Sequence, residues 1–273
     1  MKIGKKNAVL SGIISSAVLI FTASSASAVP ELASHQARYK MSLLSAEQDT
    51  QMTGLNGQVE FMLTQECQGW QSSEEYLLEF TYTNGDSALM VSYFKSWEDS
   101  DDGLYSFEVY EGSSFEPETQ FQGFASIKAG AERPHAFFSQ QPDNMVELPE
   151  DVTFPILHTQ QILERAEKGE RIFAANLFFG AEPEKALKRT NTVIGSPQPI
   201  TDSAVADMIS SDKYYPVQTA YFDPDSVAAT PEYEITFHMQ LNGIISYYEV
   251  DYGDFAIRSE LVSLDAIAQP DCS

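Results

Sequence analysis

Strict alternation of apolar and polar residues constrains this chain more than any other feature, and it is clearest from Tyr233 to Leu241. Tyr, Ile, Phe, Met and Leu alternate there with Glu, Thr, His and Gln, which is the period of a strand with one buried face. Asn242-Gly243 then supplies a favoured hairpin turn, and Ile244–Val250 returns. The sequence therefore predicts a β-hairpin in this region.

Similar alternation recurs in the first half of the chain, between turn signals such as Asn84-Gly85 and Asp102-Gly103. Short strands with regular turns are typical of an antiparallel sandwich, barrel or coiled sheet rather than of βαβ units. We expect a mainly β fold with about a dozen strands. The clearest of the other strands include Tyr39–Leu43, Val59–Leu63, Tyr76–Tyr82, Leu89–Tyr93 and Tyr105–Val109.

One helix is predicted over Pro155–Lys168, because proline suits the first helical turn and Gly169 can end the last. Ile156 and Leu163 can share its apolar face. A weaker helical segment, Asp202–Ile209, lies in a stretch rich in Ser, Pro and Asp that otherwise indicates a long surface connection.

Alternation does not distinguish a soluble barrel from an outer-membrane barrel, because both have one apolar face per strand. The predicted helix, the acidic residues on many polar faces and the shortness of most strands favour the soluble form. We expect a chain that does not span a membrane, with the outer-membrane barrel as the open alternative.

The first 28 residues have the pattern of a cleavable secretory leader. Three lysines lie among the first six residues, an apolar stretch covers about 8–22, and Ala26-Ser27-Ala28 forms a small-residue exit. The apolar stretch is shorter than the roughly 20 residues of a spanning helix, so a retained anchor is the weaker alternative. We expect cleavage after Ala28, a single β-rich domain over residues 29–273, and a periplasmic location.

Cys67 and Cys272 are the two cysteines of the chain. An oxidising compartment makes their pairing the expectation, with two buried free thiols as the alternative. Closing so long a loop stabilises a fold by about 5 kcal/mol in the chain-entropy model. The bond would also bring the carboxyl end to the early part of the fold, which argues against two domains in series.

The charge balance excludes one class of partner. The chain has 16 Lys and Arg against 40 Asp and Glu, a net charge of −24. Such a surface repels phosphates, so we expect no binding of nucleic acid.

The sequence has no recognisable catalytic pattern. His35, His135, His158 and His238 are scattered without a metal-ligand spacing, and there is no GxSxG elbow. A zinc site or a triad assembled only by folding stays open. We expect neither enzyme activity nor a metal or other cofactor. A buried, backbone-bonded His158 is favoured over a ligand or base, and His238 is expected in solvent.

Two further features have both a functional and a structural interpretation. The acidic run Glu98–Gly103 suggests calcium, but it is too tight for an EF-hand loop and lacks the distant glutamate, so we interpret it as an acidic hairpin turn. Trp70 and Trp97 could line a ligand cavity, although an aromatic β core has the same sequence signature.

Many short landmarks in a fixed order resemble the EipB family of periplasmic cell-envelope integrity proteins. The resemblance covers nearly all of the expected mature chain, and its specificity lies in the order of the matches. The landmarks are His35–Tyr39, Cys67–Trp70, Asp102-Gly103, Leu148-Pro149, Phe154–His158, Val193–Gly195, Tyr215–Val217, Ala220–Phe222, Pro231–Tyr233, Asn242-Gly243 and Cys272.

This resemblance implies an open, spiral-like antiparallel β-barrel of about fourteen strands with one central helix. It also implies a bond between Cys67 and Cys272 and a role in the cell envelope without a described enzyme activity. The candidate structural or binding positions are Trp70, Trp97, Phe154, His158 and Tyr221.

Three functions stay open at this point. The first is a non-enzymatic envelope protein, expected as a monomer, that binds a periplasmic protein or an envelope lipid or glycan. The second is a carrier whose sheet encloses a lipid or glycolipid. The third is an envelope hydrolase with a dispersed site.

Overall fold

The chain folds into a mainly β structure, as the alternation predicts. A computed structural model describes residues 31–99, 101–114, 117–127, 133–209 and 211–272, so the expected leader and its cleavage point lie outside the described residues. The described residues form sixteen strands, two α-helices and a short 3-10 turn at Gln48–Thr50. The strand number exceeds both the dozen expected from alternation and the fourteen implied by the resemblance.

The elements follow one another in two groups. The first group consists of β1 (His35–Ala46), β2 (Met52–Glu66), β3 (Gly69–Tyr82), β4 (Ser87–Asp99), β5 (Leu104–Ser113), β6 (Thr119–Ser126), β7 (His135–Phe138) and β8 (Gln141–Glu147). The second consists of β9 (Val152–Thr153), α1 (Pro155–Lys168), β10 (Ile172–Phe178), β11 (Leu187–Ile194), β12 (Gln198–Pro199), α2 (Ser203–Ile209), β13 (Lys213–Phe222), β14 (Tyr233–Met239), β15 (Ile245–Asp251) and β16 (Phe255–Ala266).

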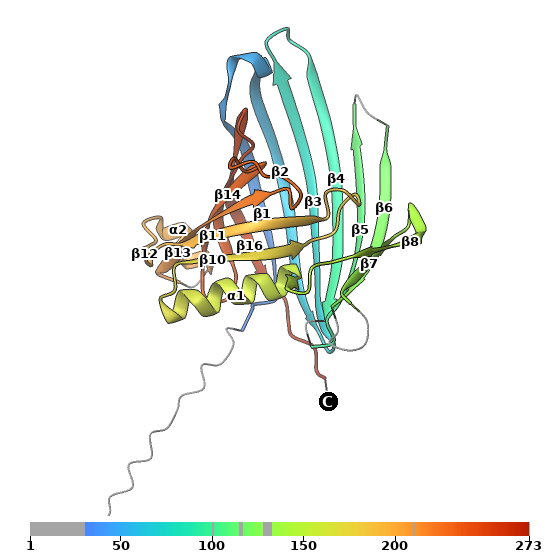
Figure 1. The fold of residues 1–273 in the computed structure, drawn as a ribbon. Helices are drawn as coiled ribbons and strands as arrows, with labels where there is room; N and C mark the ends of the chain where they lie inside the picture. The colour runs from blue at the N-terminus through green and yellow to red at the C-terminus, as the bar shows by residue number, and fades with distance from the viewer. Residues whose placement is uncertain (1–30, 100, 115–116, 128–132, 210, 273) are drawn as a thin grey trace, which may run out of the picture.

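The strands form one sheet whose first and last strands lie side by side near its middle (Figure 1). Its order is β8-β7-β6-β5-β4-β3-β2-β1-β16-β15-β14-β13-β11-β10-β9, with β12 paired to β13 outside this path. Neighbours are antiparallel apart from the short parallel pair of β9 and β10. Each half of the chain is therefore a meander, and the β1–β16 pair joins the two.

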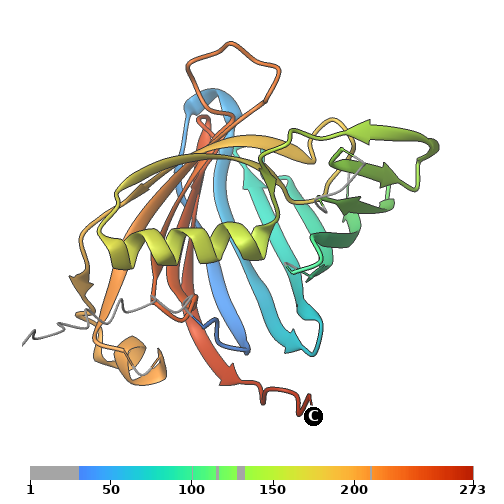
Figure 2. The same ribbon diagram turned by 60° about the horizontal axis from the view of Figure 1, so that its bottom comes forward.

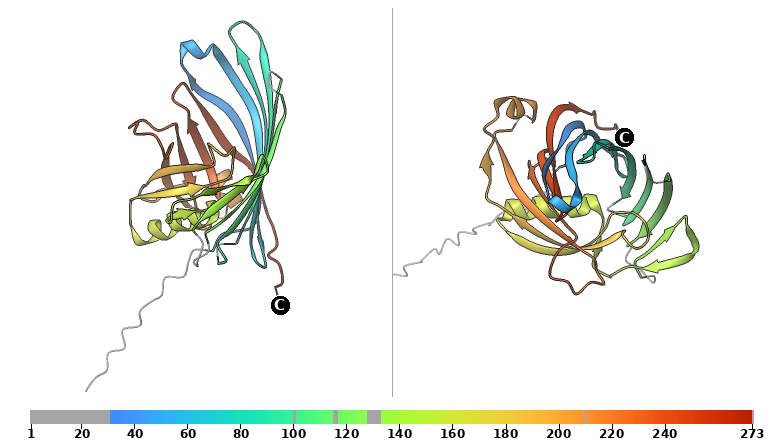
Figure 3. Two further views of the ribbon diagram at one scale, coloured as in Figure 1. Left: turned by 45° about the vertical axis from the view of Figure 1, so that its right-hand side comes forward. Right: turned by 90° about the horizontal axis from the view of Figure 1, so that it is seen from above.

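The sheet curls around α1 and stays open (Figure 3). Its two ends meet through an aromatic cluster on the inner face of β5–β7. The Tyr105 ring lies 5.0 Å from Phe154 and 6.1 Å from Phe178, and its hydroxyl donates to the Phe179 carbonyl at 2.6 Å. Because these residues come from opposite ends of the strand order, their packing holds the coil in shape. The expected open, spiral-like barrel is confirmed.

The helix α1 lies across the open side of the sheet (Figure 2), where it packs against β10 and β11. Proline at its start and Gly169 in the left-handed conformation at its end match the predicted bounds. The buried face of the helix contains the residues expected to share it, together with two more. These are Ile156, His158, Ile162, Leu163 and Ala166.

A carboxylate from β4 caps α1. Glu98 accepts hydrogen bonds from the backbone amides of Ile156 at 2.7 Å and Leu157 at 2.9 Å, two donors that the first helical turn leaves without intrahelical partners. Its side chain is 1% exposed. The predicted acidic hairpin turn is found between β4 and β5, with Asp101 and Asp102 exposed in it. Glu98 itself lies in β4 before the turn and is buried as the cap of α1.

The predicted hairpin and the weaker helix are both confirmed. β14 and β15 pair in antiparallel fashion around the Asn242-Gly243 turn, with a register shift after His238. In α2, the Asp202 carboxylate accepts from the Ala204 amide at 2.9 Å, which stabilises the start of the helix.

Cys67 and Cys272 form a disulfide, with 5.4 Å between their Cα atoms. This is the pair that the export argument predicts. It fastens the carboxyl end of the chain to the turn between β2 and β3, at the end of the long strands.

Candidate functional site

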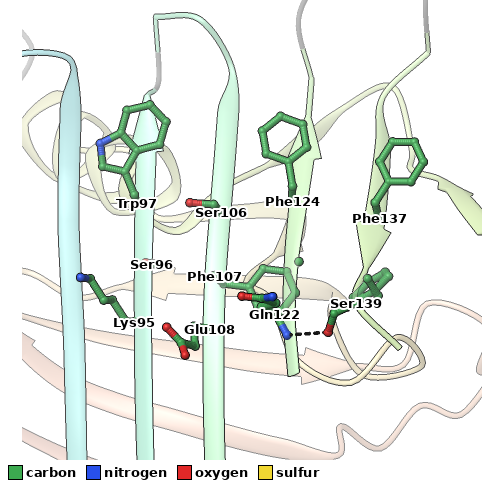
Figure 4. A pocket seen from close by; sticks show the side chains of 12 residues that line it. Lys95, Ser96, Trp97, Ser106, Phe107, Glu108, Gln122, Phe124, Phe137 and Ser139 are labelled. Atoms are coloured by element: carbon green, nitrogen blue, oxygen red, sulfur yellow. Dashed lines mark hydrogen bonds between the residues drawn. The ribbon is translucent and has the colours of Figure 1, made fainter. Parts of the chain in front are cut away.

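A groove of about 600 Å³ lies on the outer face of β4–β7, and we call it the outer groove (Figure 4). The opposite, inner face of the same strands carries the aromatic cluster that holds the coil together. Period-two alternation places neighbouring residues on the two faces in turn. The groove is lined by Lys95, Ser96, Trp97, Ser106, Phe107, Glu108, Gln122, Gly123, Phe124, Phe137, Phe138 and Ser139.

Strand register aligns three aromatic side chains across the outer groove. Trp97 on β4 faces Ser106 on β5, Ser106 faces Phe124 on β6, and Phe124 faces Phe137 on β7. We call Trp97, Phe124 and Phe137 the aromatic row. Phe124 and Phe137 are 40% and 37% exposed, which is high for aromatic residues in the middle of a strand.

A second line of cross-strand neighbours runs beside the aromatic row and is polar. Lys95 faces Glu108, Glu108 faces Gln122, and the backbone amide of Gln122 donates to the Ser139 hydroxyl at 3.1 Å. We call these four residues the polar row. Figure 4 shows the two rows lying parallel, one above the other. The groove therefore offers aromatic faces along one side and hydrogen-bonding groups along the other.

Small residues make the hollow. Ser106 separates Trp97 from Phe124, so a gap one strand wide lies between two large rings. On the inner side, Gly123 lets the Phe107 ring pack directly beneath β6, and a Cβ at Gly123 would also lie 2.8 Å from the Phe137 carbonyl. The Phe107 ring on the inner face therefore packs close to the backbone of β6, and the Trp97 and Phe124 rings on the outer face leave the space over Ser106 open.

The candidate positions do not gather in one site. Trp97 lines the outer groove, whereas Trp70 belongs to the core cluster beneath α1. Phe154 is 1% exposed and stacks on Tyr105, which makes it a core residue. Trp70 and Trp97 do not share a cavity, because they lie on opposite faces of neighbouring strands.

His158 is buried on α1, with its ring centroid 5.7 Å from that of Phe173. Its Nε2 lacks a hydrogen-bond partner among the described residues. The expected hydrogen bond between the imidazole and the backbone is therefore not found at Nε2. Burial, together with the Arg165 charge, lowers the pKa of His158 to about 4. The imidazole is therefore neutral at physiological pH and is shielded from solvent.

His238 was expected in solvent and is instead half-buried. Its ring stacks on Tyr214, with 3.8 Å between centroids, and a second contact of 4.9 Å joins it to Tyr247. Burial lowers the pKa of His238. The reason for the error is that aromatic neighbours on adjacent strands cover the polar face of β14.

Tyr221 belongs to a group of tyrosines on the inner side of the sheet. Its ring stacks on Tyr233 at 4.5 Å, and burial raises the pKa values of both phenols. On β3, Tyr76 donates to the Glu74 carboxylate at 2.5 Å, and burial raises the pKa of Glu74. Glu74 was not singled out from the sequence, because its burial depends on the curling of the sheet, although its hydrogen-bond partner Tyr76 is only two residues away on β3.

A second hollow of about 650 Å³ lies on the outer face of β1–β4. It contains the ion pair between Arg38 and Glu60, at 2.6 Å, beside the apolar side chains of Leu77 and Val91. Both hollows are thus on the outer surface of the coil rather than inside it.

Metal-binding chemistry is not evident in the part of the chain that the structure describes, where no group of three or more His, Cys, Asp or Glu side chains could hold an ion. The helices within those residues are also too short or too polar to cross a membrane.

Comparison with known proteins agrees with the barrel-like fold. The EipB-like family model matches residues 26–268, nearly the whole chain. The chain belongs to the EipB-like family. It is 28% identical over 247 residues to the cell envelope integrity protein EipB of Brucella abortus, covering 89% of this chain and 87% of the relative.

A crystal structure also resembles this EipB-like chain. It is a beta-barrel-like protein of a domain of unknown function, DUF1849, from Brucella abortus, with a TM-score of 0.78 and 25% sequence identity. The match covers 87% of this chain and 99% of the other.

Proposed function

We propose that this protein helps to maintain the integrity of the cell envelope by binding an envelope component, without catalysis, in the outer groove. The proposal places it in the periplasm as an exported monomer. Membership of the EipB-like family, and the name of the Brucella relative as a cell envelope integrity protein, support the envelope part. The exposed aromatic row is the observation that supports binding, because large exposed aromatics beside polar groups are typical of recognition surfaces.

The lining of the outer groove favours binding over catalysis. Among the described residues that line it, Lys95 and Glu108 are the charged ones, and none is a histidine. A serine nucleophile requires an adjacent base within hydrogen-bond reach, and neither Ser106 nor Ser139 has a histidine beside it in the groove. The histidine with the most strongly lowered pKa, His158, lies in the core.

The inner face of the coil favours surface binding over lipid carriage. Three clusters of buried apolar side chains occupy that face, and α1 covers the cluster that contains Trp70. The two hollows described above both open on the outside. A carrier needs an enclosed apolar cavity for its cargo, so the packing supports the first of the three functions.

A deletion strain tests the proposal. Cells without the protein should become more sensitive to detergents and to cell-wall-active antibiotics, and the unaltered gene should restore resistance. The double variant Trp97→Ala/Phe124→Ala should fold with its disulfide and yet fail to restore resistance. Leu89→Ala is the matched control, because Leu89 is an exposed apolar residue on the outer face of β4 but lies outside the groove.

The outcomes separate the parts of the proposal. Full restoration by the double variant would remove the outer groove from the function. Unchanged resistance in the deletion strain would remove the envelope role itself. Restoration by His158→Gln is expected, and its failure together with measurable turnover of a glycan or ester by the unaltered protein would favour a hydrolase.

A further inference from the structure

We infer that the outer groove binds the glycan strand of peptidoglycan, with sugar rings stacked on the aromatic row. This inference rests on the proposed function and specifies its ligand. The strand would cross β4, β5 and β6 roughly at right angles, and it would follow the line from Trp97 over Ser106 to Phe124.

The spacing of the aromatic row suits a chain of linked sugar rings. Trp97 and Phe124 stand two strands apart, which corresponds to about 10 Å in a sheet. This separation is close to the length of a disaccharide unit. The C–H face of a pyranose ring is apolar and packs on the electron-rich face of an aromatic ring. Every second sugar could therefore stack on a ring, while the sugar between them lies over Ser106.

The polar row suits the groups that project from such a chain. The hydroxyl and acetamido groups of amino sugars need both donors and acceptors. Lys95 supplies a donor, Glu108 supplies acceptors, and the Gln122 side chain supplies both. Gln120 already donates to Glu108 at 3.1 Å, which holds that carboxylate on the outer face. Aromatic stacking on one side and hydrogen bonds on the other is the combination that orients a sugar.

Charge complementarity selects an uncharged strand over an anionic lipid. The whole chain carries a net charge of −24, which repels phosphorylated head groups and nucleic acid. Within the groove, Lys95 and Glu108 balance each other. The amino-sugar backbone of peptidoglycan is uncharged along the rings, and the acid groups of its peptides project away from the backbone.

An extended peptide fits the outer groove less well. Peptides add to sheets by pairing with a free edge, because their affinity comes from main-chain hydrogen bonds. β4, β5 and β6 are interior strands whose backbones are already paired on both sides. Recognition in the groove must therefore come from side chains, which favours a ligand that binds through ring faces and projecting polar groups.

Sedimentation with purified peptidoglycan sacculi tests the inference on the disulfide-bonded protein. The unaltered protein should co-sediment, and Trp97→Ala or Phe124→Ala should weaken the apparent affinity about tenfold. Ser106→Leu fills the gap between the rings without removing either one, so it should weaken binding even if Trp97→Ala proves unstable. Leu89→Ala should bind like the unaltered protein.

Tryptophan fluorescence gives a second measurement with a defined probe, the tetramer of N-acetylglucosamine. Trp97 is half-buried in the groove and Trp70 is in the core, so the probe should shift the emission of the unaltered protein. Ser106→Leu keeps Trp97 but fills the gap between the rings, so its emission should not shift. Trp97→Phe, which removes the reporting side chain, identifies the tryptophan that gives the signal. Absence of sedimentation with sacculi, or sedimentation that the groove variants leave unchanged, would overturn the glycan inference. Loss of complementation by the double variant without any binding to sacculi would overturn this inference alone and leave the proposed function standing.

Discussion

The two faces of β4–β7 are made from the same strands, and both are rich in aromatic residues. On the inner face, the side chains of Tyr105 and Phe107 are at most 3% exposed and pack on one another. On the outer face, Phe124 and Phe137 keep more than a third of their surface exposed. Burial on the inner face contributes to stability, whereas the exposed rings contribute little to it and remain available to a ligand.

The largest loss of stability is expected from removing the disulfide, which belongs to neither face of β4–β7. Replacing Cys272 by Ser should lower the free energy of unfolding by about 5 kcal/mol, because the disulfide closes a loop between residues 205 positions apart and so restricts the unfolded chain. Urea unfolding followed by circular dichroism measures the loss. Cys67→Ser should have the same effect, and a loss from only one of the two would contradict the explanation.

Phe107→Ala should lower the free energy of unfolding by about 3–5 kcal/mol, the range for removing a large core side chain. Phe107 contacts Phe138 and Phe178, with ring centroids 5.9 and 6.0 Å away, so the change leaves a cavity between the two ends of the coil. Urea unfolding again gives the value. A loss below 1 kcal/mol would mean that the inner cluster does not hold the coil together.

His158 should make stability depend on pH. Its pKa is about 4 in the folded protein, below its ordinary value of 6.5, so the unfolded chain binds more protons between these values. Its contribution is fully present above pH 6.5 and is lost as pH falls to 4, by about 3 kcal/mol in total. The difference between the unaltered protein and His158→Gln isolates this effect from Glu74, whose raised pKa acts in the opposite direction. Parallel pH profiles for the two proteins would contradict it.

Phe124→Ala should have the smallest effect on stability, a loss below about 1 kcal/mol, because the ring already keeps 40% of its surface exposed. The same change should weaken binding in the outer groove. Thermal unfolding and sacculus sedimentation on one preparation measure both. A loss comparable to that of Phe107→Ala would erase the distinction between the two faces.

Local patterns predicted the elements well, because each depends on neighbours in sequence. Alternation from Tyr233 to Leu241 predicted β14, and proline with Gly169 bounded α1. Contacts between distant segments were not predictable from such patterns. Glu98 caps a helix that begins 57 positions later, and nothing beside Glu98 in the sequence signals that partner.

The outer groove was missed for a related reason. Trp97 was a candidate, but Ser106, Phe124 and Phe137 join it only through the register of four strands. Alternation places Ser106 and Phe107 on opposite faces of one strand, but it does not say which face is covered or that Phe124 lies beside Ser106. The segments Phe121–Phe124 and His135–Phe138 did carry a signal, because each has aromatic residues at both odd and even positions and so on both faces of its strand.

The pairing of β1 with β16 has a consequence for how the chain reaches its native state. One edge of β1 stays unpaired until β16, more than 200 residues later in the chain, is available to pair with it. Contacts that span most of a chain form slowly, and an exposed strand edge invites pairing with other molecules. While the chain folds, a half-sheet of β1–β8 is therefore expected to be vulnerable to aggregation and proteolysis. Chaperones that shield the waiting edge of β1 would raise the yield of folded protein more than any factor acting on β14 and β15.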